Sequence, residues 1–397
     1  MKKVLLLCAS HNDLGLIWAL RKLGYFIIST GSMPGLIGEK YVDEYIQADY
    51  SDKDLILNIA KQKNMDAVCP CCNDFGVYTA AYVAEKLGLP GYDSYETTLI
   101  LHNKDRFKRF AKENHIPTPE AKIFSDDQQA YEYIQKAAYP IIVKPTDCSA
   151  GNGIHKAEDK EEGFAAVKEA FLKSRAGRIV IEPYISGTQH GFCTFLSKQK
   201  VVAYCSNNEY SFINPYRVEI DTFPADKDHQ VSGLLIGQIE KIAKALSLKD
   251  GIFHLQYMMN PNGDPQIIEV MRRTIGNMYW YPASMRNGFD WNYWEARARC
   301  GLSCESFPKE AVSEGFYAYK TILAKENGII ETIQIPEKYK KNLMNTLILK
   351  KEGDLVTHYE SEPIGFFFFN FSSPEEMKQI LVEEYDNSAV TVKKEQV

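Results

Sequence analysis

The first hundred residues alternate short apolar runs with amphipathic segments. The apolar runs predict strands at residues 4–7, 25–29 and 67–69. The amphipathic segments predict helices at residues 14–23, 51–63 and 77–87. This alternation predicts a parallel sheet covered by helices. The loop after the first run, residues 8–15, lacks the glycine fingerprint of a dinucleotide site, so we expect a Rossmann-like module that does not bind NAD.

A second series of elements begins after Ile116-Pro-Thr-Pro119, where two prolines favour a domain boundary. Its predicted strands are residues 141–144, 179–182, 192–196 and 201–204. Its predicted helices are residues 128–137, 161–175 and 231–246. Beyond residue 314 the chain is rich in predicted strands, of which residues 345–350 and 365–371 are the clearest. Four consecutive phenylalanines at 366–369 predict one strand that is buried on both faces.

Residues 254–273 predict a hairpin that brings two oxygen-bearing side chains together. Asn262-Gly263 between two apolar runs indicates a two-residue type I′ turn, which places Gln256 opposite Glu269. Such a pair suits a hard cation such as Mg²⁺, the ion that often accompanies nucleotide phosphates. An ordinary polar cross-strand pair that faces water is the alternative. The opposite face of the hairpin predicts core residues, namely Leu255, Tyr257, Ile268 and Val270.

Composition narrows the classes of partner. The chain has 397 residues, 45% of them hydrophobic, and its 46 basic and 52 acidic residues give a net charge of −6. Because these charges are interspersed, we expect neither nucleic acid nor a membrane as a partner. No apolar run reaches transmembrane length and the N-terminus does not resemble a signal peptide, so we expect a cytoplasmic protein. The nine cysteines predict reduced thiols rather than a disulfide framework.

Two lysines and one glutamate occupy positions suited to nucleotide binding. Lys144 ends an apolar strand before a loop of small residues, where its charge and the loop's N–H groups can contact phosphates. Lys104 lies in the first turn of a predicted helix and opposes the helix dipole, so we expect an anion beside it, either Asp105 or a phosphate. Glu182 precedes a proline in a hinge where freed backbone groups can bind a planar heterocycle. Each segment also has an ordinary structural interpretation.

The order of these segments resembles the ATP-grasp family. Lys104 at a helix start, Lys144 before a small-residue loop, the hinge Glu182-Pro-Tyr-Ile-Ser-Gly187 and a carboxylate hairpin that ends at Arg273 follow one another as in that family. The resemblance covers residues from 1 to about 310. It includes the Rossmann-like pre-domain of carbamoyl-phosphate synthetase large chains, biotin carboxylases and the glycinamide ribonucleotide enzymes.

The resemblance implies a fold of four parts that combines α/β and α+β architecture. These are a Rossmann-like pre-ATP-grasp domain at 1–115, a small ATP-grasp subdomain that forms the nucleotide lid at 116–190, a large subdomain for metal and substrate at 191–310, and a small strand-rich C-terminal region at 311–397.

The resemblance also implies a set of site residues. Those for ATP are Lys104, Lys144, the mobile loop Ser149, Ala150, Gly151, Asn152 and Gly153, then Glu182 for the adenine amine, the backbone of Tyr184 and Ile185 for the ring, and Gln189 for the ribose. Those for Mg²⁺, with Mn²⁺ as an alternative ion, are Gln256 and Glu269. Arg273 and Lys144 are the implied catalytic residues, with Arg273 facing the transferred phosphate or the substrate carboxylate.

Two positions depart from the family pattern. The family usually has an asparagine two residues after the hairpin glutamate, as a ligand of a second ion, but this chain has Met271, opposite His254. A thioether is a poor Mg²⁺ ligand, so we expect the second ion to have fewer protein ligands. Gln189 stands near the position where many members have a ribose-binding glutamate, and an amide can also bond a hydroxyl.

The predicted function is an ATP-dependent ligase that joins a small-molecule carboxylate to an amine through an acyl phosphate and releases ADP and phosphate. Candidates for substrate contacts are Arg217, Arg272, Asn277 and Tyr279, although arginines beside a sheet are often structural ion pairs. The alternatives are a carboxylating or carbamoyl-phosphate-type enzyme that uses bicarbonate, and an inactive ATP-binding regulatory protein. By analogy with the family, we expect a homodimer.

Overall fold

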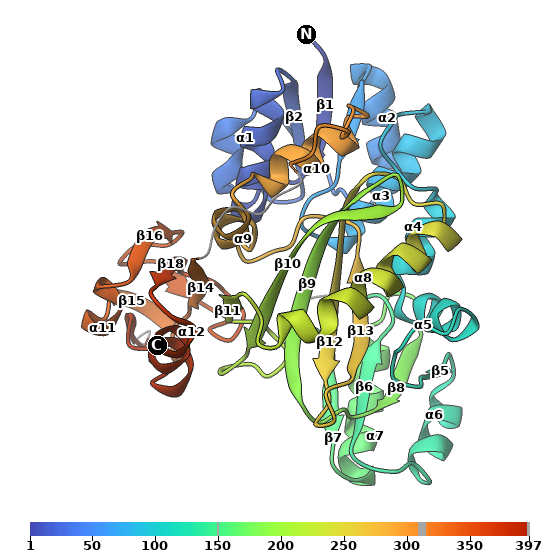
Figure 1. Cartoon of the computed structure of the whole chain (residues 1–397), viewed down its shortest axis with the longest axis vertical. Coiled ribbons are helices and arrows are strands. Elements are labelled where there is room, and N and C mark those ends of the chain that lie inside the picture. The colour runs from blue at the N-terminus through green and yellow to red at the C-terminus, as the bar shows by residue number, and fades with distance from the viewer. Residues whose placement is uncertain (149–150, 309–314, 395–397) are drawn as a thin grey trace.

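A computed structural model describes residues 1–148, 151–308 and 315–394 in four sheets with flanking helices (Figure 1). The predicted loop residues Ser149 and Ala150 lie outside the described residues. Within the described part of the chain, no helix has the length and apolar character needed to cross a bilayer.

The N-terminal sheet is parallel, with strand order β3-β2-β1-β4. Its strands are β1 (Lys3–Leu7), β2 (Phe26–Gly31), β3 (Glu44–Gln47) and β4 (Ala67–Cys69). Its helices are α1 (Leu14–Lys22), α2 (Lys53–Lys63) and α3 (Asp74–Leu87), and short 3₁₀ turns lie at His11–Asp13 and Ile37–Tyr41. Separate hydrophobic cores lie on the two faces of the sheet. The predicted Rossmann-like module is therefore confirmed.

The second sheet is antiparallel and forms the lower part of the molecule in Figure 1, with strand order β5-β8-β6-β7. Its strands are β5 (Lys122–Phe124), β6 (Ile141–Pro145), β7 (His155–Ala157) and β8 (Ile179–Pro183). Helices α6 (Asp127–Ile134) and α7 (Lys160–Lys173) pack on it through a small apolar core. Two helices link this unit to the N-terminal sheet, α4 (Tyr95–His102) and α5 (Lys104–Glu113).

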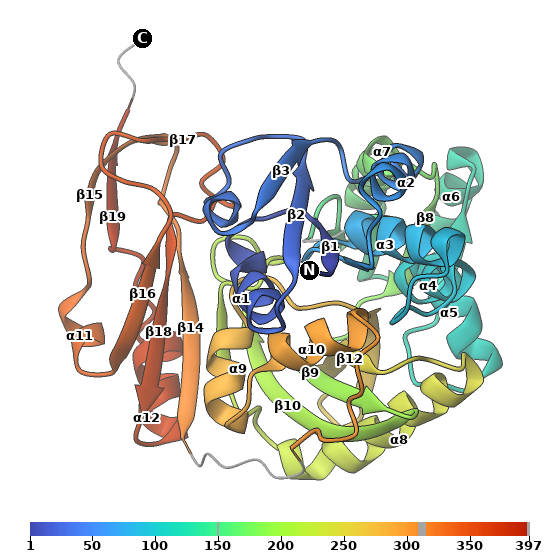
Figure 2. The same cartoon turned by 90° about the horizontal axis from the view of Figure 1, so that it is seen from above.

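The third sheet has eight strands in the order β13-β12-β9-β10-β11-β14-β18-β16. Five of them precede residue 300: β9 (Thr188–Ser197), β10 (Lys200–Tyr210), β11 (Ile220–Phe223), β12 (Gly251–Met259) and β13 (Pro265–Met271). Helix α8 (Asp228–Ala245) covers one face, and α9 (Trp280–Asn287) and α10 (Trp291–Arg299) cover the other, as Figure 2 shows. Helix α10 also packs against α1, which joins the large sheet to the N-terminal unit.

The C-terminal region contributes the last three strands of this sheet, β14 (Phe316–Ile322), β16 (Leu343–Ile348) and β18 (Gly365–Phe371). It adds a separate three-stranded sheet of β15 (Gly328–Ile333), β17 (Leu355–Val356) and β19 (Val390–Lys393), with α11 (Glu337–Lys340), α12 (Pro374–Lys378) and a π-helical turn at Gln379–Glu383. The large sheet thus continues past residue 310. The domain boundary expected at that residue remains a prediction.

The four-phenylalanine strand is buried on both faces, as predicted. Phe366 and Phe368 belong to the core that contains α9 and α10, whereas Phe367 and Phe369 belong to the core beneath α11 and α12. All four are at most 3% exposed. A continuous apolar run therefore marks the strand that joins the C-terminal cores.

The hairpin turn differs from the prediction. Pro261, Asn262 and Gly263 form a three-residue loop, closed by a hydrogen bond of 2.9 Å from the Gly263 N–H to the Asn260 carbonyl oxygen. Gly263 has a φ of +88°, the left-handed conformation that completes a type I turn in hairpins of this length. Pro261 suits the first central position of that turn because its φ is already fixed. The prediction of a two-residue type I′ turn is therefore wrong.

A β-bulge restores the predicted pairing at the far end of the hairpin. Tyr257 pairs with Ile267, but Gln256 pairs with Glu269, so Ile268 is an extra residue in β13. The pairing of Gln256 with Glu269 is confirmed for a reason the sequence did not reveal. The bulge also turns Ile268 out of the predicted core and into a cavity, while Ile267 is fully buried in its place.

Candidate functional site

A cavity of about 630 Å³ lies between the second sheet (β5-β8-β6-β7), the β12–β13 hairpin, the loops after β1 and β4, and the C-terminal region. The second sheet corresponds to the lid expected from the sequence and is called the lid sheet below. It is lined by twelve of the predicted site residues: Lys104, Lys144, Gly151, Glu182, Tyr184, Ile185, Gln189, Arg217, Gln256, Glu269, Arg273 and Asn277. Asn152, Gly153 and Arg272 are not among the residues that line it. Residues as far apart in sequence as His11 and Pro363 therefore converge on one cavity.

Lys104 and Glu269 form an ion pair inside the cavity. The Lys104 Nζ donates to Glu269 Oε1 at 2.8 Å and to the carbonyl oxygen of Cys148 at 2.7 Å. Burial lowers the pKa of Lys104, but the charge of Glu269 outweighs burial and leaves that pKa above its ordinary value. The anion expected beside Lys104 is therefore Glu269, not Asp105, which pairs with Arg178.

Glu182 forms ion pairs with two lysines. Lys144 on β6 donates to Glu182 Oε2 at 2.8 Å, and Lys108 on α5 lies 3.1 Å from Glu182 Oε1. Burial raises the pKa of Glu182, but the two ammonium groups outweigh burial and hold that pKa below its ordinary value. The sequence prediction missed Lys108, although its position four residues after Lys104 places both on one face of α5.

A second acidic group lies beside the predicted metal ligands. Glu209 on β10 accepts hydrogen bonds from the amides of Gln256, at 2.8 Å, and Gln189, at 2.6 Å. Burial raises the pKa of Glu209 above its ordinary value. With its amide nitrogen engaged, Gln256 has its oxygen left as the group available to a cation. No local pattern points to Glu209, which reaches the cavity only through the pairing of β9, β10 and β12.

The position of the expected second-ion ligand holds apolar or neutral groups. Met271 pairs with His254, as the sequence predicted, and both line the cavity. Burial, followed by the charge of Arg273, lowers the pKa of His254 to about 3, so its ring is neutral. Among the described residues, no group of three or more His, Cys, Asp and Glu side chains could hold a metal ion. A cation at Gln256 and Glu269 would therefore have few protein ligands.

Adjacent arginines have different surroundings. Arg273 lines the cavity, and its Nε donates to Asp74 Oδ1 at 2.7 Å. Arg272 points the other way, donates to Asp93 Oδ2 at 2.9 Å and is 3% exposed. The structure thus favours the ion-pair alternative for Arg272 over a substrate contact.

The other substrate candidates divide in the same manner. Asn277 lines the cavity with a φ of +54° and donates to the Val218 carbonyl oxygen at 3.0 Å. Arg217 lines it as well, and its Nη1 donates to the carbonyl oxygen of Ser361 at 2.9 Å. Tyr279 is not among the lining residues, since its hydroxyl donates to Asn207 in the buried core.

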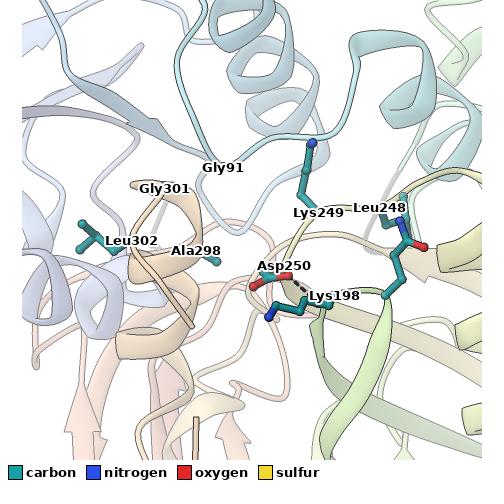
Figure 3. Close-up of a pocket in the computed structure, with 9 residues that line it drawn as sticks. Gly91, Lys198, Leu248, Lys249, Asp250, Ala298, Gly301 and Leu302 are labelled. Carbon is teal, nitrogen blue, oxygen red and sulfur yellow. Dashed lines mark hydrogen bonds between the residues drawn. The ribbon is translucent and has the colours of Figure 1, made fainter. Parts of the chain in front are cut away.

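A separate hollow of about 470 Å³ lies beside α10, away from these residues (Figure 3). Lys198, Lys249, Asp250 and Leu302 line it, and the backbone N–H of Lys198 donates to Asp250 at 2.8 Å. It contains none of the predicted site residues. The larger cavity is therefore the candidate site.

Comparison with known proteins finds one family match in sequence and several matches in fold. Residues 102–214 match the family model described as phosphoribosylglycinamide synthetase, ATP-grasp (A) domain. The chain superposes on the L-amino acid ligase of Bacillus licheniformis with a TM-score of 0.83 at 19% identity, covering 100% of this chain and 99% of that one. It superposes on phosphoribosylglycinamide synthetase from Anaerococcus prevotii with a TM-score of 0.75 at 20% identity, covering 99% and 100%. Residues 102–214 therefore resemble an ATP-grasp domain in sequence, and the whole chain has the fold of these ligases.

The curated proteins that resemble this chain in sequence extend well beyond the part that aligns with it. The carbamoyl phosphate synthase large chain of Clostridium acetobutylicum is 24% identical over 67% of this chain and 25% of its own length. The phosphoribosylamine–glycine ligase of Leptospira interrogans is 24% identical over 55% of each chain. The chain therefore spans between a quarter and about half of the length of these relatives.

Proposed function

We propose that the protein is an ATP-dependent ligase that joins a carboxylate to an amine and releases ADP and phosphate. One observation carries this proposal: Lys104–Glu269 and Lys144–Glu182 form two lysine–carboxylate pairs in a single cavity, beside Gln256. The lysines have the charge that nucleotide phosphates require, and the carboxylate–amide pair has the oxygens that a hard cation requires.

The end of the cavity formed by the lid sheet and the hairpin is the proposed nucleotide site. Lys104 and Lys144 are proposed to bind the phosphates, and Gly151 to cover them. The hinge of Glu182, Tyr184 and Ile185 is proposed to bind the adenine, with Gln189 near the ribose. Asn152 and Gly153 retain the loop role expected from the sequence as part of this proposal, although they do not line the cavity.

Gln256 and Glu269 would hold Mg²⁺ or Mn²⁺. The two residues pair across the hairpin, so their side-chain oxygens lie near each other. Lys104 donates a hydrogen bond to Glu269, and we propose that the cation takes the place of this lysine. When bound, such an ion neutralises charge on the phosphates during transfer.

Acyl transfer is proposed for the opposite end of the cavity. A carboxylate oxygen attacks the γ-phosphorus, the bond from that phosphorus to the β-phosphate oxygen breaks, and ADP leaves. The amine then attacks the acyl carbon and loses a proton. The bond from that carbon to the phosphate oxygen breaks, which releases phosphate and leaves the amide. Arg273, held by Asp74, lies where it can stabilise charge on the transferred group or on the carboxylate.

The identity of the substrates belongs to the same proposal. The relatives' names indicate glycine, other amino acids or bicarbonate as carboxylate components. We favour a carboxylate–amine pair, and bicarbonate-dependent ADP release without an amine would favour the carboxylating alternative. The homodimer and the cytoplasmic location expected from the sequence remain predictions.

The test is a panel of carboxylates and amines scored by ADP and phosphate release. We expect turnover that needs both a carboxylate and an amine and that falls at least about a hundredfold in Glu269→Ala, as for loss of a group that stabilises the transition state. Glu113→Ala, at an exposed position on α5, is the matched control. ATP binding without ADP formation across the panel would support the inactive regulatory protein instead, and unchanged turnover in Glu269→Ala would rule out the metal assignment.

A further inference from the structure

Glu182 has more positive charge around it than one carboxylate needs. Lys108 and Lys144 contact different oxygens of Glu182, and all three side chains are at most 7% exposed. Glu182 and Lys144 line the cavity, whereas Lys108 is not among the lining residues. Lys108 therefore contacts the side of the Glu182 carboxylate that faces away from the cavity. A ligand in the cavity would meet Glu182 and Lys144 before Lys108.

Nucleotide binding would change the partner of Lys144. In the proposed function, its ammonium group turns to a phosphate and leaves Glu182 Oε2. A buried carboxylate that loses its only cation is strongly destabilised, which would oppose binding. A second cation behind Glu182 removes this obstacle.

We propose that Lys108 is a positioning residue, which stays on Glu182 and keeps that carboxylate paired and in place when Lys144 turns to a nucleotide phosphate. This proposal rests on the proposed function. It explains why α5 presents two buried lysines, Lys104 and Lys108, to two different carboxylates of the cavity.

The Lys104–Glu269 pair also needs a replacement cation when its lysine turns to a phosphate, and obtains it from a different source. Lys104 is the lysine that contacts Glu269 among the described residues, and no second lysine is paired with that carboxylate there. Glu269 is the side chain for which the proposed function supplies a divalent cation. Each carboxylate thus has a replacement cation when its lysine leaves: a metal ion for Glu269 and Lys108 for Glu182.

Proton linkage gives a readout that needs no substitution. Burial lowers the pKa of Lys108 to about 8, Glu182 opposes this effect, and the like charge of Lys144 adds to it. The charged groups that act on Lys108 are Glu182 on β8, Lys144 on β6 and, least strongly, Glu269 on β13. When Lys144 moves towards a phosphate, its repulsion weakens and the pKa of Lys108 rises. Binding should therefore take up a fraction of a proton near pH 8.5.

The experiment is calorimetric titration with ADP and Mg²⁺ at pH 8.5 in buffers of different ionisation enthalpy. Phosphate oxygens of ADP are fully ionised at that pH, so they do not contribute to the uptake. We expect proton uptake by the wild-type protein, no uptake by Lys108→Met, and a dissociation constant about tenfold higher in that variant. Without nucleotide, the melting temperature of Lys108→Met should change little, because Lys144 still pairs with Glu182.

Three further variants separate positioning from a purely structural role. Lys108→Arg should restore most of the affinity, and Lys112→Met, at an exposed position on α5, should bind ADP as the wild type does. In the Glu182→Gln background, Lys108→Met should cause no further loss, because an amide needs no cation.

The outcomes distinguish this inference from the function beneath it. Wild-type affinity in Lys108→Met, the same proton uptake in that variant, or full additivity with Glu182→Gln would overturn the role of Lys108 alone. A wild-type protein that binds no ADP would overturn the proposed function and this inference with it.

Discussion

The two ends of the cavity are built differently. At the lid end, charged side chains from regular elements satisfy one another, as Lys104 with Glu269 and Lys144 with Glu182. At the opposite end, the lining comes from the loops after β1 and β4, with the neutral groups Asn12 and Asn73, and from the C-terminal region. Ligands at the first end would exchange with existing partners, whereas ligands at the second would meet a surface held by the surrounding fold.

Because of this difference, a substitution can impair either the chemistry or the stability of the fold. At the lid end, removal of one lysine leaves a carboxylate that a ligand cation can still pair with. At the opposite end, Arg273 is held by Asp74, whereas its neighbour Arg272 points away from the cavity and is held by Asp93. Substitution of either arginine should therefore affect the chemistry or the fold, according to whether its side chain lines the cavity or is buried outside it.

The largest expected effect comes from comparing Arg273→Met with Arg272→Met. Arg273→Met should lower turnover by about 10²–10³-fold, because it removes a charge that lines the cavity. Arg272→Met should leave the turnover of folded protein nearly unchanged but lower the free energy of unfolding by about 3–5 kcal/mol, since Asp93 would stay buried without its partner. Urea denaturation and steady-state kinetics measure the two quantities. Equal turnover losses at equal folded fractions would contradict the division between these arginines.

An intermediate effect is expected at Lys104, where the exchange of partners can be observed directly. Lys104→Met should strengthen the binding of Mn²⁺ without nucleotide by about tenfold, or about 1.4 kcal/mol, because the lysine no longer competes for Glu269 Oε1. The same variant should weaken ADP binding. Titration of free Mn²⁺ by electron paramagnetic resonance measures the first effect, and Lys112→Met is the control. Weaker Mn²⁺ binding in Lys104→Met would mean that the lysine supports the cation site rather than occupying it.

Sequence patterns predicted the lid end better than the opposite end, for a physical reason. Lys104 and Lys144 lie at the ends of regular elements whose apolar periodicity is local, and so their positions follow from the pattern around them. Asp74 reaches Arg273 only when the N-terminal unit docks on the large sheet, a contact between residues 199 apart. No local pattern encodes such a contact.

The hairpin shows how a correct pairing can follow from an incorrect turn. The predicted two-residue loop and the observed three-residue loop differ by one residue, and the bulge at Ile268 compensates for that difference before Glu269. Because one added residue moves every later side chain to the other face, the bulge is what directs Glu269 into the cavity. Single-sequence periodicity does not distinguish a bulged strand from a regular one.

The smallest expected effect concerns the glycine loop that covers the lid end. Gly151 has a φ of +74°, and a Cβ there would lie 2.4 Å from the Tyr216 carbonyl oxygen. Gly177 has a φ of +61°, but a Cβ there would meet no atom within 4 Å. Alanine at either position carries the strain of a left-handed backbone, about 1 kcal/mol or more, so the difference between the two variants isolates the contact with Tyr216.

Gly151→Ala should therefore raise KM for ATP by about three- to tenfold, or about 1 kcal/mol, because the loop is pushed from its position over the cavity. Gly177→Ala should lower the melting temperature by a similar or smaller amount than Gly151→Ala, because only the strain applies there, and should leave KM unchanged. Steady-state kinetics with varied ATP, together with thermal unfolding of both variants, measure the contrast. If KM rises equally in both, backbone strain rather than the approach to Tyr216 controls the loop, and Gly151 has no special role at the lid end.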